Sequence, residues 1–123
     1  MADQSSSEQK LEAAKNEADS WLALIDNSSF EESWEKASTL FRRSLSKEAW
    51  VETIEKTLGM FGSVLSREER DRSYATELPG APDGEYFTFV FASQMEKKKS
   101  ATERVILMTD TDGTPRVSGY FIQ

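Results

Sequence analysis

The sequence contains neither cysteine nor histidine. Without cysteine the chain can form no disulfide bond and no thiolate metal site. The lack of histidine removes the side chain most used as a general acid or base near neutral pH and as a transition-metal ligand. Ser-His-Asp catalysis, Cys-His catalysis and His-based zinc chemistry are therefore excluded. We expect no metal site, no cofactor and no set of catalytic residues.

Long apolar runs are also missing, and none approaches the roughly 20 residues that a membrane-spanning helix needs. The first seven residues are polar where the apolar part of a signal peptide would lie. The sequence therefore predicts no membrane span. It leaves two locations open: periplasmic or exported if Met1 replaces a removed signal peptide, and cytoplasmic if Met1 is native.

Positive charge is scarce, because 15 basic residues face 22 acidic ones and the net charge is -7. Binding to nucleic acid needs a basic face that neutralises phosphates. Lys97-Lys98-Lys99 is the one run of three basic residues, and it follows Glu96 directly. We interpret it as a solvated hairpin loop rather than a phosphate-binding patch, and nucleic acid is not an expected partner.

The length of 123 residues indicates one domain, and 37% hydrophobic residues are enough to build its core. We expect a disordered leader over residues 1–6 and a single domain over residues 7–123.

Apolar residues at helical spacing predict three helices in the N-terminal half. The first covers about residues 5–26. The second starts with the capping-box spacing of Ser29–Glu32 and weakens in its middle, so a break before Arg42 is expected. The third covers about residues 46–62, with a serine as N-cap and glycines at its end. All three tryptophans lie on the apolar faces of these helices: Trp21, Trp34 and Trp50.

From residue 63 the apolar period changes to two, which predicts strands. Four are expected, over residues 63–78, 85–95, 101–109 and 116–122. The second strand carries Phe87, Phe89 and Phe91 on one face and Tyr86, Thr88 and Val90 on the other. Because both faces are largely apolar, we predict a central strand whose second face is a candidate homodimer surface.

Other features of these strands have simpler interpretations. The charged run of residues 67–72 predicts a solvated strand face or an exposed edge. Asp110-Thr111-Asp112-Gly113 opens like a calcium loop but lacks the later acidic ligand, so we interpret it as a hairpin turn. Gly119 predicts a bulge or the close approach of a helix.

Three helices followed by a four-stranded antiparallel sheet give the α+β class. The simplest packing is a curved sheet wrapped on the helices, which is the cone of cystatin-like and nuclear-transport-factor-2-like proteins. Such a fold carries no function by itself.

Several motifs resemble one bacterial family, the domain-of-unknown-function family four thousand and nineteen. The most specific is residues 78–86, Leu-Pro-Gly-Ala-Pro-Asp-Gly-Glu-Tyr, supported by residues 117–120, Trp21-Leu22 and Ser33-Trp34. The resemblance covers about residues 14–122. It implies the fold and a small exported protein, and it implies no activity because the family has none assigned.

Function is expected to be binding or interaction rather than catalysis, in the bacterial envelope if the protein is exported. The alternatives are a small apolar or anionic ligand, or a Tyr/carboxylate acid–base enzyme, each using the interior of the cone. The partner would be an unknown protein, a small apolar ligand or a second copy of the chain. The candidate ligand-binding residues are Trp34, Trp50, Glu85, Phe87, Phe89, Phe91, Arg104 and Tyr120.

Overall fold

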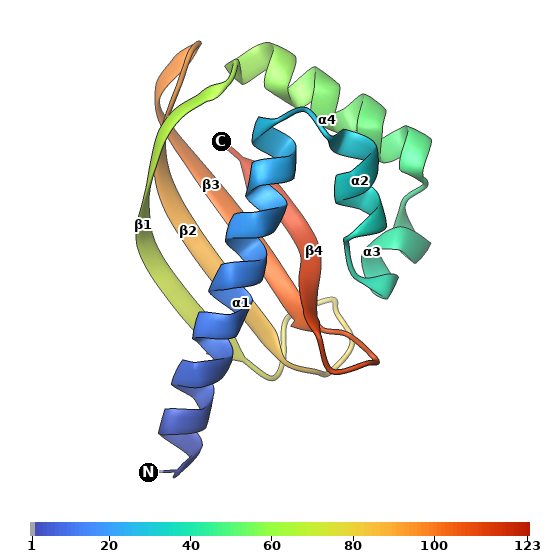
Figure 1. Ribbon diagram of the computed structural model, residues 1–123, viewed down its shortest axis with the longest axis vertical. Helices are drawn as coiled ribbons and strands as arrows, with labels where there is room; N and C mark the ends of the chain where they lie inside the picture. The colour runs from blue at the N-terminus through green and yellow to red at the C-terminus, as the bar shows by residue number, and fades with distance from the viewer. Residues whose placement is uncertain (1) are drawn as a thin grey trace.

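The computed structural model describes the backbone of residues 2–123 and the side chains from residue 7 onward. The helices precede an antiparallel sheet, as the predicted α+β class requires (Figure 1). The helices are α1 (Ala2–Asp26), α2 (Phe30–Glu35), α3 (Thr39–Ser44) and α4 (Lys47–Phe61). The strands are β1 (Val64–Ala75), β2 (Tyr86–Met95), β3 (Lys98–Thr109) and β4 (Pro115–Ile122). No helix within residues 2–123 has the length and apolar character needed to cross a membrane.

The strands pair in chain order, β1-β2-β3-β4, so β1 and β4 are the edges of the sheet. α1 runs along one face of the sheet, which we call the inner face. α2 and α3 lie beside β4, beyond that edge, and α4 runs from there across the end of the sheet toward the start of β1 (Figure 1). The opposite, outer face carries no helix of the described residues.

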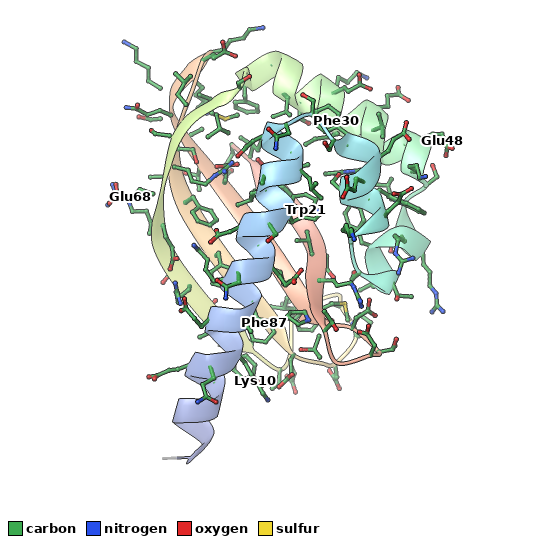
Figure 2. The ribbon with its side chains drawn as sticks, in the orientation of Figure 1. Lys10, Trp21, Phe30, Glu48, Glu68 and Phe87 are labelled. Atoms are coloured by element: carbon green, nitrogen blue, oxygen red, sulfur yellow. The ribbon has the colours of Figure 1, made fainter. Side chains whose placement is uncertain are left out.

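The core forms where α1 meets the inner face. The buried stripe of α1 consists of Ala14, Ala18, Trp21, Leu22 and Ile25. Its two alanines have no long side chain to hold the helix away from the sheet, and both are fully buried. Opposite them lie the predicted inner residues Phe87, Phe89 and Phe91. Figure 2 shows Phe87 behind α1, between the helix and the sheet.

The structure has four helices where the sequence predicted three, because the second one breaks at residues 36–38. There Ser38 donates its backbone N–H to the carbonyl of Val117 in β4, at 2.8 Å. The Ser38 hydroxyl accepts from Phe41 N and caps α3. The break therefore docks the helices on β4, and it lies before Arg42 as the weakened pattern indicated.

Some of the predicted helix caps are present in the structure and others are not. Ser46 caps α4 by accepting from Ala49 N at 3.1 Å, and Gly62 ends it with φ 78°. The side chain of Ser29 makes no capping hydrogen bond, because its ψ of 60° is outside the extended conformation of an N-cap. α1 begins at Ala2, and the disordered leader expected over residues 1–6 stays a prediction.

The charged run of residues 67–72 lies on an edge strand, as one of the two sequence interpretations predicted, and only one of its faces is solvated. Its outward residues are exposed, and Figure 2 shows Glu68 pointing away from α1. Arg67, Glu69 and Arg72 instead face α1 on the inner side of β1. Their partners on the helix are Asp26, Lys15 and Glu12. β1 is therefore attached to α1 through ion pairs rather than an apolar stripe.

On the outer face, one end of the predicted apolar surface is covered by the chain itself. Tyr86 is 2% exposed, and its hydroxyl donates to the carbonyl of Pro82 in the loop before β2. Tyr86 therefore does not face water as the sequence indicated. Val90, Ile106 and Met108 remain partly exposed on this face.

Candidate functional site

A cleft of about 600 Å³ lies between α3, α4 and the edge strand β4. None of the side chains that line it is charged. α4 contributes one helix face, with spacings of three and four residues: Trp50, Thr53, Ile54 and Thr57. α3 contributes Leu40, Phe41 and Ser44, followed by Leu45. Residues 118–122 of β4 form the opposite wall.

The base of the cleft is an aromatic cluster held by hydrogen bonds. The rings of Trp50 and Phe41 meet edge to face at 5.1 Å, and those of Trp21 and Tyr120 at 5.4 Å. Both indole nitrogens donate to Ser33, from Trp50 to its hydroxyl and from Trp21 to its carbonyl, each at 2.8 Å. These bonds fix the indole rings, so the base of the cleft is formed in advance of any ligand.

Beneath this base lies a buried carboxylate, Glu103 of β3, with an exposed fraction of 0%. Arg67 donates to both of its oxygens, at 2.8 Å to Oε1 and 2.9 Å to Oε2. Ser93 donates to Oε1 and Tyr120 donates to Oε2. Each oxygen therefore accepts two hydrogen bonds, and its lone pairs are already used within the protein.

The protonation states in this cluster follow from these contacts. Burial alone would raise the pKa of Glu103, but hydrogen bonds from Arg67, Ser93 and Tyr120 outweigh it, and the pKa lies below its usual value. Burial and the adjacent carboxylate raise the pKa of Tyr120. Glu103 is thus ionised and Tyr120 protonated at neutral pH. The cluster is a salt bridge that Asp26 extends by accepting from Arg67 at 2.8 and 3.1 Å.

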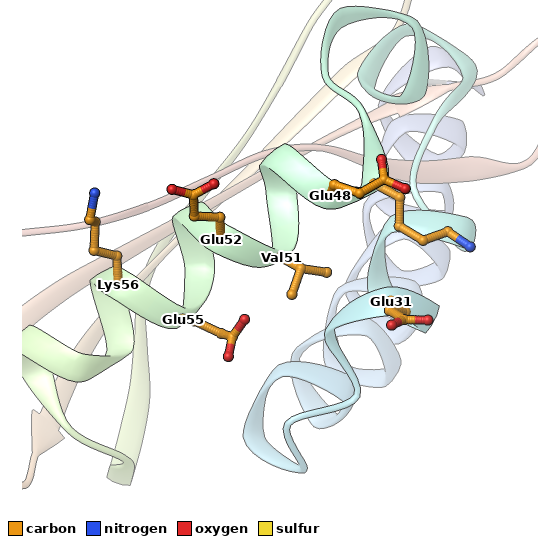
Figure 3. Close-up of a pocket in the computed structure, with 7 residues that line it drawn as sticks. Glu31, Glu48, Val51, Glu52, Glu55 and Lys56 are labelled. Atoms are coloured by element: carbon orange, nitrogen blue, oxygen red, sulfur yellow. The ribbon is translucent and has the colours of Figure 1, made fainter.

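A second depression, between α2 and α4, is charged (Figure 3). Its lining is Glu31, Lys47, Glu48, Val51, Glu52, Glu55 and Lys56. Figure 3 shows the carboxylates of Glu52 and Glu55 on opposite sides of α4. Within the described residues, no three acidic side chains are arranged to hold a metal ion.

Of the eight candidate ligand-binding residues, the structure brings Trp50 and Tyr120 together at the apolar cleft. The three phenylalanines of β2 are buried beneath α1 instead. Trp34 lies on α2, where its indole nitrogen donates to the carbonyl of Leu45 at 2.7 Å.

The two charged candidates lie elsewhere and have partners of their own. Glu85 accepts from Lys10 at 2.6 Å, from Tyr74 at 2.9 Å and from Thr109 at 2.9 Å. Arg104 lies on the outer face, with its guanidinium 5.5 Å from the ring of Phe121. These two residues do not form a common anion site.

The Asp110–Gly113 segment is a hairpin turn, as predicted. Gly113 has φ 83°, and both carboxylates are held by Arg116. Asp110 also accepts from the backbone and hydroxyl of Thr39, which fixes the turn to the start of α3.

Sequence reasoning missed most of the cleft. Thr53 and Thr57 were not among the predicted site residues, and Ile122 was predicted only as the end of the fourth strand. The available signal was that Thr53 and Thr57 are four residues apart and lie next to Ile54 on the helix. Their methyl groups widen the apolar face of α4. The position of this face beside an edge strand could not be predicted, because it depends on the order of the strands in the sheet.

The fold and its sites define a small α+β domain with an aromatic core, a buried ion pair and an apolar cleft at the sheet edge. The chain belongs to the family described as Protein of unknown function (DUF4019), which matches residues 17–120. The match confirms the resemblance found in the sequence. None of the curated proteins matches this chain.

Proposed function

We propose that the protein is a non-catalytic binding domain and that the cleft between α3, α4 and β4 is its binding site. One observation carries the proposal: the lining is uncharged, and it surrounds Trp50 and Tyr120, which hydrogen bonds hold in place. Sites for small ligands are typically apolar, largely preformed and of similar volume. An apolar group therefore suits this cleft better than an anion does.

An acid–base enzyme would need a tyrosine and a carboxylate that can reach a substrate. Tyr120 with Glu103 and Tyr74 with Glu85 are pairs of this kind. Glu103 is already paired with Arg67, and Glu85 with Lys10. These contacts favour binding over catalysis.

The proposal is tested by titrating the protein with N-phenyl-1-naphthylamine, an uncharged fluorescent probe, and with fatty acids, while tryptophan emission is recorded. Thr53→Phe places a ring in the cleft at an exposed position of α4. Val51→Phe is the matched control, because Val51 lines the other depression. We expect saturable binding to the parent chain and the control, and binding at least about tenfold weaker in Thr53→Phe, about 1.4 kcal/mol. No saturable binding, or equal binding to all three, would contradict the proposal.

Narrower predictions from the sequence extend this proposal: the cystatin-like or nuclear-transport-factor-2-like cone, an envelope location and a homodimer through the outer face. The partly exposed Val90, Ile106 and Met108 support the homodimer. Sedimentation velocity at two ionic strengths tests it. A monomer at high protein concentration would rule it out.

A further inference from the structure

The edge strand β4 presents free backbone groups to the cleft. Thr102 and Gln123 exchange two N–H···O bonds, at 2.8 and 3.0 Å. Since antiparallel pairs alternate, Phe121 bonds to β3 in the same way, while Tyr120 and Ile122 turn their N–H and C=O groups away from β3. Both residues line the cleft.

The chain covers part of this edge and leaves the rest open. At Val117, the outward carbonyl accepts from the N–H of Ser38. Within residues 2–123, no hydrogen bond joins the outward backbone groups of Tyr120 or Ile122 to another part of the chain. An unpaired strand edge is a template for a further strand.

We infer that the occupant of the cleft is an extended peptide segment of another protein, which adds to β4 as a fifth strand. The inference rests on the proposed binding role of the cleft and specifies its ligand. Backbone groups of Tyr120 and Ile122 supply the hydrogen bonds, and the uncharged face of α4 receives every second side chain. The peptide therefore carries apolar side chains at alternate positions over about five residues.

A second copy of this chain fits the edge less well. In Figure 1, α2, α3 and the nearer end of α4 extend beyond β4, and the segment before α3 is bonded to this edge through Ser38 and Val117. A copy that paired through its own β4 would bring the same helices into that space. A single strand needs only about 4.8 Å beside β4. A peptide segment is therefore the occupant that the arrangement favours.

The test uses the full chain and dodecapeptides selected against it from a random phage-displayed library, with the best one synthesised. Ile122→Pro removes the outward N–H and leaves the bonds to β3 in place, since proline is tolerated at such edge positions. Ile122→Val is the matched control, which keeps the N–H and a similar apolar wall. We expect the peptide to bind at least about tenfold more weakly to Ile122→Pro and within about threefold of the parent affinity to Ile122→Val.

Amide hydrogen exchange provides a direct readout of the added strand. Saturation with the peptide slows exchange at Tyr120 and Ile122, whose N–H groups point outward. Exchange at Phe121 changes little, because its N–H is already bonded within the sheet.

The outcomes separate this inference from the proposed function. One contrary outcome is that the naphthylamine probe binds the cleft but no peptide is selected. Another is that the selected peptide binds Ile122→Pro and the parent chain with equal affinity. In both cases the strand inference is overturned and the binding role stands. If neither probe nor peptide binds, both are overturned. A dimer that forms without peptide and is lost in Ile122→Pro would make a second copy the occupant and would also overturn the inference.

Discussion

Arg67 of β1 and Glu103 of β3 form a bidentate ion pair across the intervening strand β2, with N···O distances of 2.8 and 2.9 Å. The carboxylate is fully buried and the arginine side chain is 18% exposed. A buried ion pair adds little net stability, because its attraction is offset by the loss of hydration. Removing one partner is costly, since the other is left as an uncompensated charge.

Glu103→Gln is expected to lower the free energy of unfolding at neutral pH by about 3 kcal/mol, the lower end of the usual cost of breaking a buried pair. The cost is at this end because Arg67 keeps Asp26 as a second partner. Urea denaturation measures it. Glu68→Gln, on the exposed side of β1, is the control and should change stability by less than about 0.5 kcal/mol. Equal effects of the two substitutions would show that the pair is not buried as described.

The same ion pair predicts that the free energy of unfolding depends on pH in the acidic range. The folded-state pKa of Glu103 is lowered below the ordinary value of 4.5, so its contribution is present above that pH and is lost as the pH falls toward the lowered pKa. Other carboxylates with lowered pKa values, such as Glu69 and Asp110, also lower the free energy of unfolding of the parent protein as the pH falls. The difference between the parent chain and Glu103→Gln isolates Glu103. We expect this difference in unfolding free energy to shrink below pH 4.5; a constant difference would refute the assignment.

Trp21→Ala is expected to cost about 3–5 kcal/mol, because it empties the centre of the interface between α1 and the sheet. Trp21 is 3% exposed and contacts the rings of Trp50 and Tyr120. Trp21→Phe keeps much of the packing and loses the bond to Ser33, so its cost should be smaller. Thermal and urea unfolding provide the measurement, and a melting temperature unchanged in Trp21→Ala would contradict the packing.

Gly119 tolerates a side chain only if Phe121 moves. A β-carbon at Gly119 would lie 3.1 Å from Cε2 of Phe121 and 3.8 Å from Cβ of Ile106. The close neighbour is therefore a ring on the outer face and not a helix, while the predicted bulge is present next to Gly119. Gly119→Val should destabilise the protein by about 1 kcal/mol, within the usual range for point substitutions, and by less in a Phe121→Ala background. The same cost in both backgrounds would point to the backbone instead of the ring.

The order of the elements was predictable because the two halves of the chain have different apolar periods. The stripe that ends in Trp21, Leu22 and Ile25 has helical spacing, and Phe87, Phe89 and Phe91 alternate. The break at Ser38 was harder to place, because it depends on a hydrogen bond to Val117 on a strand far along the chain.

The candidate site was less predictable, because its parts come from elements that only the tertiary structure brings together. Trp50 and Tyr120 were recognised as candidates by their size and polarity. Their neighbours Thr53 and Thr57 belong to the site only because α4 lies beside the β4 edge. The inner role of Arg67 was hidden in a run of alternating charges, where nothing local distinguishes a buried arginine from a solvated one.

The position of Arg67 also determines which residues of β1 and β2 can pair. β1 is polar on both faces, so an apolar pattern cannot fix its alignment as it does for β2. If β1 slipped by one residue, Arg67 would turn to the outer face, and Glu103 would be left buried without its cation. Arg67 and Glu103 therefore act as a register lock, which admits one alignment of an edge strand that could otherwise slide along its neighbour.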